Sequence, residues 1–345
     1  MAGNFLHNAW YVAAEAEEIG REPFGRILLN EPVVIYRRED GTAVALEDTC
    51  PHRRAPLSEG TLQGDNIQCP YHGIVFDCAG KAVWVQGADR IHSSMKVRVY
   101  PLAERYGWLW IWMGDPVLAD EAQIFDASKC ADPEWATIKG MMHCKAGAMV
   151  AIDNLMDLSH TAFVHAGTVG AKDDLNPELV WERKENWIKG TRKAARMTPS
   201  ATYVDRGAVG FQLSQTKTMA YTPPYNCNVD IFTKEADCEP GQERFNEQFL
   251  TYNMITPETD RTCFYFWANT RNFNVDNEAY NELNARNAAK LLGEDRKIIE
   301  SVQRMTDLNP AKGEVDLAAD AGGLQARRIL RRLIEAERAL ATAAE

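Results

Sequence analysis

The first third of the chain consists of short β-branched, apolar runs separated by turn residues. Residues 26–48 are interrupted at Asp40-Gly41, and residues 75–83 repeat the pattern around Ala79-Gly80. Short Gly-containing breaks between such runs indicate β-hairpins. The run from Tyr106 to Met113 predicts a closing strand, so we expect an all-β domain over residues 1–120.

The pattern changes after residue 120, where helical and strand-like segments mix. A helix is expected around residues 147–160, strands between about 180 and 270, and two late helices. The first late helix spans roughly Asn277 to Met305. The second follows Gly322-Gly323, and on its polar side we expect a solvent-facing row of Arg327, Arg328, Arg331 and Arg332. The prediction is an α+β protein with a second domain over residues 121–345.

Composition narrows the possible partners. The 345-residue chain carries 38 basic and 49 acidic side chains, a formal net charge of −11, without a long Lys/Arg run, so neither a nucleic-acid nor an anionic-membrane partner is expected. No run of about 18 apolar residues occurs, and the start lacks the regions of a signal peptide. We expect a cytoplasmic protein whose eight cysteines are reduced or bind metal.

Residues 50–73 hold two mixed pairs of metal-binding side chains, Cys50 with His52 and Cys69 with His72. Common zinc fingers place both cysteines in one pair and both histidines in the other. In a Rieske [2Fe-2S] cluster, two cysteines hold one iron and two histidines hold the other, which suits two loops that each supply one of each. The spacing favours a Rieske cluster, with a zinc site as the alternative.

A second polar group lies in the otherwise apolar residues 151–165. Asn154, Asp157 and His160 recur every three residues and therefore share one face of a helix, where polar groups need buried partners. His165 lies about 140° further round an ideal helix than His160, so both reach one metal only if the helix ends or bends between them. A lone histidine is more often a satisfied core residue, but two histidines beside a carboxylate indicate a metal site.

The first late helix offers a third ligand, Asp295. It falls on a helical stripe formed by Leu291, Ile298 and Val302. A carboxylate on a core-facing stripe needs a partner, and a buried hydrogen-bonded or N-cap aspartate is the alternative. With His160 and His165 it would form the two-histidine, one-carboxylate triad that leaves positions on iron(II) open for oxygen. Glu294, about 100° away, is expected to face solvent.

These motifs resemble the Rieske non-haem iron oxygenases, in particular the short type represented by vanillate and dicamba O-demethylases. The resemblance is carried by C-x-H followed by C-P-Y-H-G, and by FLHNAWYVAA, DNLMDLSH, ITPETD, YFWANTRNF, GED and DAGGLQARR. It implies a Rieske domain followed by a helix-grip catalytic domain, an antiparallel sheet around helices. It also implies a homotrimer in which Asp157 bridges His160 to His72 of the partner subunit, while Asn154 lines the iron site.

The resemblance further implies a terminal oxygenase. Electrons would pass from NAD(P)H through a separate flavin or ferredoxin-type reductase to the [2Fe-2S] cluster and then to iron(II), which activates O2 beside the substrate. The expected reaction is O-demethylation of a methoxylated aromatic acid such as vanillate, with release of formaldehyde. Hydroxylation or N-demethylation of another aromatic or ring substrate is the alternative, and an electron carrier without oxygenase activity is a weaker one.

Two residues match substrate-contact positions of the family. These are Asn253 and Arg286. Arg286 would pair with a carboxylate or sulfonate through its planar guanidinium. The alternatives are hydrogen bonding within the sheet for Asn253 and an ordinary surface position on the helix for Arg286.

Overall fold

The computed structural model describes residues 4–165, 179–199, 201–239 and 241–344. The chain divides into two compact units. The first contains Met1–Phe125, Thr256–Asp260 and Glu337–Glu345, and the second contains Asp126–Ile255 and Arg261–Ala336. The division after Phe125 lies near the expected boundary at residue 120, but two later segments also belong to the first unit. A change in composition along the chain does not reveal such segments.

The first unit contains three small sheets. They have the strand orders β1-β11-β10, β2-β3-β4-β9 and β5-β6-β7-β8. The strands are β1 (Trp10–Glu15), β2 (Phe24–Leu28), β3 (Glu31–Arg37), β4 (Ala43–Glu47), β5 (Thr61–Gln63), β6 (Asn66–Gln68), β7 (Val75–Phe76), β8 (Ala82–Trp84), β9 (Val99–Tyr100), β10 (Leu102–Arg105) and β11 (Trp108–Trp112). The expected all-β start of the chain and both of its hairpins are confirmed.

Glycines with positive φ make these hairpin turns. Gly41 has φ +86° between β3 and β4, and Gly80 has φ +73° between β7 and β8. A Cβ atom on Gly80 would also lie 2.3 Å from the carbonyl oxygen of Val97. Side chains other than glycine rarely adopt this backbone conformation, and at Gly80 there is no room for one.

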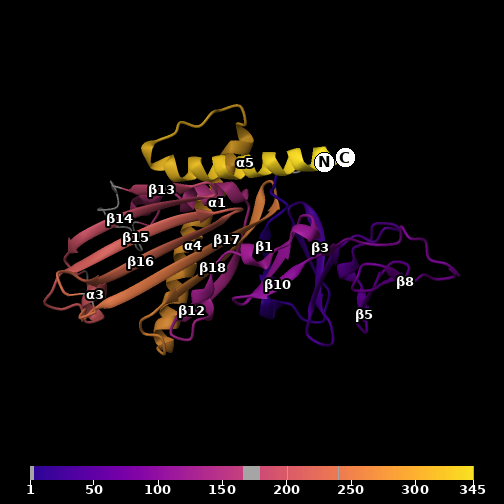
Figure 1. The fold of residues 1–345 in the computed structure, drawn as a ribbon, viewed down its shortest axis with the longest axis horizontal. Helices are drawn as coiled ribbons and strands as arrows, with labels where there is room; N and C mark the ends of the chain where they lie inside the picture. Colours follow the sequence, from indigo (N-terminus) through magenta and orange to yellow (C-terminus); the bar gives the residue numbers. More distant parts are fainter. Residues whose placement is uncertain (1–3, 166–178, 200, 240, 345) are drawn as a thin grey trace. The chain divides into compact units, whose positions relative to one another are not determined.

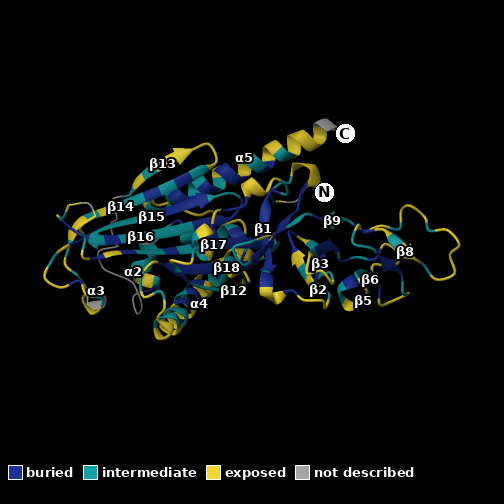
Figure 2. Ribbon diagram, turned by 60° about the horizontal axis from the view of Figure 1, so that its bottom comes forward, coloured by how far each residue is buried: buried dark blue, intermediate teal, exposed yellow. Residues whose placement is uncertain are grey.

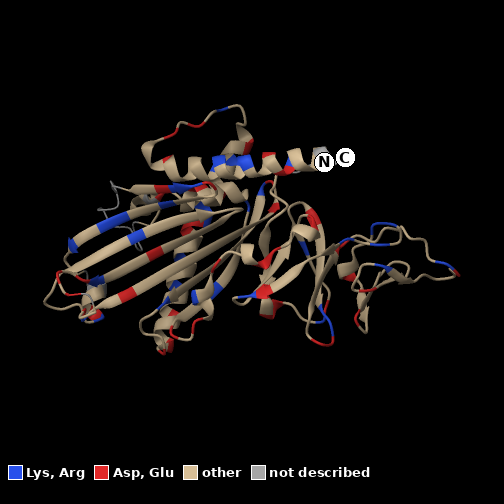
Figure 3. Cartoon of the chain, in the orientation of Figure 1, with Lys and Arg blue, Asp and Glu red and all other residues tan. Residues whose placement is uncertain are grey.

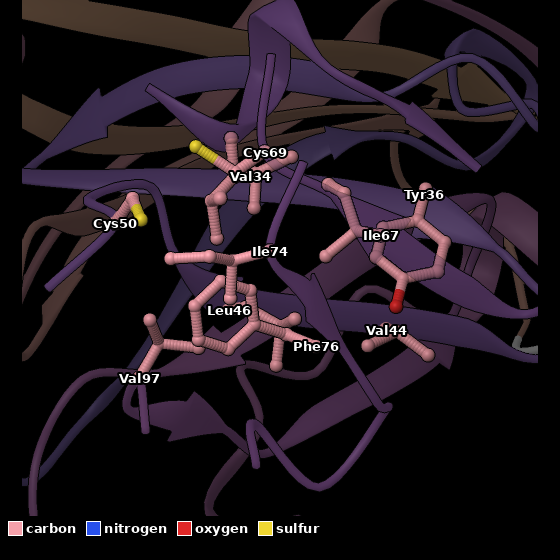
Figure 4. Close-up of a cluster of buried hydrophobic side chains, with 11 residues drawn as sticks. Val34, Tyr36, Val44, Leu46, Cys50, Ile67, Cys69, Ile74, Phe76 and Val97 are labelled. Atoms are coloured by element: carbon pink, nitrogen blue, oxygen red, sulfur yellow. The ribbon is translucent and has the colours of Figure 1, made fainter. Parts of the chain in front are cut away.

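The core of the first unit includes the two cysteines that are predicted to bind the [2Fe-2S] cluster. Its buried cluster consists of Val34, Tyr36, Val44, Leu46, Cys50, Leu57, Ile67, Cys69, Ile74, Phe76 and Val97. Figure 4 shows the thiols of Cys50 and Cys69 at one edge of this cluster. Packed apolar side chains therefore fix the backbone on which both cysteines stand.

The second unit is built on a seven-stranded antiparallel sheet with the order β12-β18-β17-β16-β15-β14-β13 (Figure 1). Its strands are β12 (Ala136–Cys144), β13 (Val180–Lys184), β14 (Trp187–Met197), β15 (Leu213–Thr222), β16 (Asn226–Glu235), β17 (Asn246–Thr259) and β18 (Thr262–Arg271). β18 is buried along almost its whole length, which Figure 2 shows in dark blue. The predicted strands between residues 180 and 270 are confirmed.

Helices accompany this sheet. They are α1 (Ala148–Leu155), α2 (Thr161–Val164), α3 (Ala201–Asp205), α4 (Glu278–Leu308) and α5 (Ala321–Ala344). α4 contacts β12, α1 and α2. Side chains of α4 also hold the start of α1, because Glu300 accepts from the N–H of Lys145 and Gln303 accepts from that of Gly147, both at 3.0 Å. Gly147 is the N-cap of α1, so one N–H at the start of this helix is satisfied and the segment that enters it is fixed to α4.

The buried face of α4 is shifted by about one residue from the face that the sequence predicted. Its buried residues are Ala288, Leu292, Asp295 and Ile299. Ile298 and Val302, which were expected in the buried stripe, are 42% and 43% exposed. Asp295 is buried as predicted, because it belongs both to the predicted stripe and to the face that is buried in the structure.

Helix α5 also departs from expectation at its start and on its polar side. Gly322 and Gly323 lie inside the helix rather than before it. Figure 3 shows the arginines of α5 as a blue stretch, but Arg327 is not simply solvated. Its Nε donates to both carboxylate oxygens of Asp153, at 2.9 and 3.0 Å. This pair connects α5 to α1.

Within the described residues, every helix is either too short or too polar to span a bilayer.

Candidate iron centres

The two predicted cluster loops, which begin at Cys50 and Cys69, share one backbone conformation. In each loop the cysteine N–H donates to the carbonyl five residues later, and the N–H four residues later donates back to the cysteine carbonyl, at 2.8–3.1 Å. The residue in that fourth position has positive φ in both loops, +61° at Arg54 and +71° at Gly73. The mirrored sequence pairs therefore fold into two matching ligand loops.

The thiols and imidazoles of these loops lie in different environments. Cys50 and Cys69 are 1% and 2% exposed. His52 and His72 are exposed, and their ring centroids are 4.5 Å apart. Two buried thiols and two exposed imidazoles match a cluster with one iron on cysteines and the other on histidines.

A single zinc ion fits this arrangement less well. Among the residues that the structure describes, one group of three such ligand atoms lies mutually within 4.8 Å, and it is elsewhere in the chain. The cluster-loop residues are not in that group, and their two buried thiols and two exposed imidazoles suit two irons better than one zinc. Burial raises the pKa of the Cys50 thiol, which the backbone N–H of His52 opposes. Cationic irons would supply the remaining stabilisation of the thiolate.

The helix expected around residues 147–160 is shorter than predicted, and a second short helix leads from one candidate histidine ligand to the other. α1 ends at Leu155, a 3₁₀ turn covers Leu158–His160, and the short helix α2 ends with His165 as its C-cap. The imidazole centroids of the two histidines are 5.3 Å apart. The end of α1 at Leu155 lies before both histidines and was not predicted; the end required between them is that of α2 at Val164, and it leaves the two rings side by side.

His160, His165 and Asp295 form the group whose ligand atoms lie within 4.8 Å of one another. Nε2 of His165 is 3.2 Å and Nε2 of His160 is 3.5 Å from Oδ1 of Asp295. The side chains are 2%, 17% and 6% exposed for His165, His160 and Asp295. Two imidazoles and one carboxylate are the donor set of mononuclear iron(II) sites, so these residues fit the metal.

Neighbouring polar groups hold this triad. The Nδ2 of Asn154 donates to Oδ1 of Asp295 at 3.3 Å. The Nδ1 of His160 lies against the backbone carbonyl of Asp157. The Asp157 carboxylate accepts from the N–H of Ser159 at 2.8 Å, which fixes the 3₁₀ turn. The structure thus places Asn154 and Asp157 directly beside the candidate triad.

Sequence reasoning missed one carboxylate of this site. Glu294, expected in solvent, has Oε2 2.9 Å from Nδ1 of His165, and its side chain is 27% exposed. Burial lowers the pKa of His165, but hydrogen bonds to Asp295 and Glu294 outweigh it, so the pKa is raised. The one available signal was a second acid directly before a proposed iron ligand, because a metal-bound histidine commonly donates its other N–H to a carboxylate.

The two proposed substrate contacts occupy unlike positions. Asn253 is 1% exposed, donates to the carbonyl of Cys227 at 3.2 Å and accepts from the hydroxyl of Tyr265 at 2.9 Å. Arg286 is 68% exposed on α4 and lies 3.7 Å from Glu282. Asn253 uses its side-chain amide within the sheet, and Arg286 lies beside an acid on its own helix. Substrate binding by either residue stays a prediction.

A cavity of about 410 Å³ lies between β17, β18 and α4. Leu291 and Leu292 line it one helical turn before Asp295. The rest of its wall is formed by Phe249, Thr251, Trp267, Asn269, Asn284, Asn287, Ala288 and Lys290. It combines aromatic surface with amide and ammonium donors.

The remaining cysteines show no ligand geometry. Among them, Cys144, Cys227 and Cys263 are fully buried. Burial raises the pKa of the Cys227 thiol to about 12, so it remains protonated. These residues act as small apolar side chains.

Comparison with known proteins agrees with both centres. Residues 9–101 match the Rieske [2Fe-2S] domain, and residues 144–336 match the vanillate O-demethylase oxygenase C-terminal domain. The chain is 37% identical over 344 residues to a putative toluene-4-sulfonate monooxygenase system iron-sulfur subunit of Comamonas testosteroni, covering 96% of this chain and 98% of that protein. It is 33% identical to the vanillate O-demethylase oxygenase subunit of Pseudomonas sp. strain HR199, covering 99% and 98%.

A solved structure shows the same fold. Dicamba monooxygenase bound to 3,6-dichlorosalicylic acid superimposes with a TM-score of 0.88 and 32% identity, over 97% of this chain and 99% of that chain. The two domains are those of a Rieske non-haem iron monooxygenase, and the cluster loops and the histidine-carboxylate triad are the candidate sites for its cluster and its iron. The chain belongs to the vanillate O-demethylase oxygenase family of these enzymes.

Proposed function

We propose that the chain is a terminal oxygenase component that O-demethylates a methoxylated aromatic acid such as vanillate. The main support is the candidate iron triad, and a cavity lies along the same helix, with Leu291 and Leu292 in its wall one turn before Asp295. Relatives with more than 30% identity over nearly the whole chain are named as vanillate and dicamba O-demethylases. The proposal places the methoxy group toward the triad and the acid away from it.

The cavity has the size and chemistry for such a ligand. Its volume of about 410 Å³ is in the range of small-molecule sites. Phe249 and Trp267 supply apolar faces for an aromatic ring. Among the described residues, Nδ2 of Asn284 has no hydrogen-bond partner, and Lys290 adds an ammonium group. Both are donors for an anionic substituent.

Each residue group has a separate task. His160, His165 and Asp295 would hold iron(II), and the four cluster-loop ligands would hold the [2Fe-2S] cluster. When bound, these groups supply O2 activation and one-electron transfer. The Asn154 amide keeps Asp295 in place, and burial excludes water from the reacting atoms. A methyl ether carbon that gains a hydroxyl group becomes a hemiacetal, which collapses to a phenol and formaldehyde.

The electrons require partners. We infer that NAD(P)H reduces a separate flavin or ferredoxin-type reductase, which then reduces the cluster through the exposed edge at His52 and His72. Support comes from relatives named as components of multicomponent systems. The proposed assembly is a homotrimer in which Asp157 bridges His160 to His72 of the partner subunit. Asp157 stands three residues before His160 and touches it through its backbone carbonyl, while its carboxylate accepts from the N–H of Ser159, so the bridge through that carboxylate rests on the family resemblance.

N-demethylation or hydroxylation of another ring is the second candidate. A chloroacetanilide N-alkylformylase oxygenase component is 31% identical over 96% of this chain. The asparagine side chains in the cavity wall both donate and accept hydrogen bonds, so they would bind an uncharged amide substrate as well as an acid.

The test is product analysis with a compatible reductase, NADH and a panel of methoxybenzoates and N-methyl aromatics. O-demethylation gives one formaldehyde and one phenol for each substrate consumed. A ring-hydroxylated product that keeps its methoxy group would contradict it, as would oxidation of N-methyl substrates alone. A cluster that accepts electrons while no substrate is oxidised, even after iron(II) addition, would indicate an electron carrier.

A further inference from the structure

We propose that Glu294 is a positioning residue that orients His165 and thereby sets the affinity of the catalytic site for iron(II). This inference rests on the proposed iron site but not on the identity of the substrate. Its basis is the 2.9 Å contact between Oε2 of Glu294 and Nδ1 of His165.

The contact determines which nitrogen of His165 faces the metal. An ionised carboxylate only accepts hydrogen bonds, so Nδ1 of His165 carries the proton and donates it. Nε2 then has a free lone pair, and it is this atom that lies 3.2 Å from Oδ1 of Asp295. Glu294 therefore selects the tautomer that binds a metal.

Helix α4 contacts both edges of the same imidazole. Glu294 and Asp295 are consecutive residues in its middle, one at Nδ1 and the other at Nε2. His165 is the C-cap of the four-residue helix α2, whose own hydrogen bonds cannot fix a ring. The long helix thus provides one ligand directly and orients a second.

The two iron histidines have unequal supports. His160 meets a neutral acceptor, the backbone carbonyl of Asp157, whereas His165 meets a charged one. Hydrogen bonds to charged groups are the stronger kind, and a carboxylate acceptor raises the basicity of a metal-bound imidazole. His165 is therefore the ligand whose strength depends most on a replaceable side chain.

The experiment compares metal binding by Glu294→Ala and Glu294→Gln with the wild type. Both variants keep the Rieske cluster, whose visible absorbance reports on folding. Glu282→Gln is the matched control, because Glu282 lies on the same helix and is 65% exposed. Cobalt(II) is the probe, read by titration and by its visible ligand-field bands in the difference spectrum.

Glu294→Ala is expected to weaken cobalt(II) binding about 10–100-fold and to shift the ligand-field bands. Glu294→Gln keeps an acceptor oxygen without the charge and is expected to lose less affinity, while Glu282→Gln changes nothing. Unchanged affinity and bands in Glu294→Ala would overturn the inference. His160→Ala separates the two proposals: if that variant also binds cobalt(II) normally, the iron site itself is wrong.

Discussion

At the scale of single residues, the catalytic centre depends on carboxylate and imidazole groups removed from water. Asp295 has 6% of its side chain exposed and contacts two imidazoles and the Asn154 amide. A buried carboxylate is costly unless it is paired, and a cation between these groups provides the charge that they lack. The site is thus organised for a metal.

Replacement of a ligand should empty this centre selectively. We expect Asp295→Ala and His160→Ala to lose about one iron per chain and all oxygenase activity while the cluster spectrum remains, because a triad with one ligand removed holds iron(II) weakly. Iron and acid-labile sulfide assays on anaerobically purified protein measure this. Arg286→Ala, at an exposed position on α4, serves as the metal-binding control. Iron content unchanged by both ligand replacements would contradict the assignment.

Spacing predicts ligands well when they are local and poorly when their partners are distant. The loops of Cys50 and Cys69 lie within 24 residues of sequence, counting Cys50 through Gly73, and their pattern is readable at once. Glu294 was misplaced because a helical wheel measures angles on one helix but does not show that α2 approaches its flank. Asn253 was left open because its partners, Cys227 and Tyr265, stand on other strands.

At the scale of elements, two glycines let α5 approach its neighbours. A Cβ atom on Gly322 would lie 2.5 Å from the ring of Trp181 and 2.7 Å from the carbonyl oxygen of Met156. On Gly323 it would lie 2.8 Å from Oδ1 of Asp153. The helix therefore begins earlier than the sequence predicted, because close packing requires glycine where propensity alone favours a break.

Gly322→Ala should destabilise the second unit by about 1–3 kcal/mol, since a backbone oxygen cannot move aside for the added methyl group. Gly293→Ala is the matched control in α4, where a Cβ would meet nothing within 4 Å. There alanine should stabilise the helix by about 0.5–1 kcal/mol. Chemical denaturation followed by far-UV circular dichroism measures both. Equal stability of the two variants would show that α5 is not packed this closely.

The chain's elements were largely predictable, but their interruptions and contacts were not. The strands and the two late helices follow from local periodicity and turn residues, whereas the end of α1 at Leu155 was not predicted. The displaced stripe of α4 and the pairing of Arg327 with Asp153 depend on which elements meet in space. Those contacts join residues far apart in sequence, and periodicity carries no information about them.

Within the first unit, a histidine between two acids makes stability depend on pH. Nε2 of His7 is 3.6 Å from Glu31, and its Nδ1 is 3.8 Å from Glu337. The Glu337 carboxylate raises the pKa of His7 above its usual 6.5, although burial opposes it. This stabilisation is complete below the unfolded pKa and is lost as pH rises through the folded pKa.

The expected result is a fall in stability from pH 6 to above the raised pKa, worth at most about 1 kcal/mol for a partly exposed pair. His7→Gln should remove this part of the pH dependence, and the difference between variant and wild type isolates it from other titrating groups. Thermal loss of the cluster's visible absorbance is the measurement. Parallel pH profiles for the two proteins would rule out the His7 contribution.

At the scale of the whole molecule, the two centres belong to separate compact units, so the metals should be separable. The cluster cysteines are buried in a packed core, whereas the triad has one ligand, His160, with 17% of its side chain exposed. We expect the full chain to hold about three irons and two sulfides, and a mild chelator to remove about one iron without sulfide loss. Substrate oxidation should stop while the cluster remains reducible, and iron(II) should restore it. Simultaneous loss of iron and sulfide would mean that the two units unfold together, and zinc without sulfide would exclude the oxygenase.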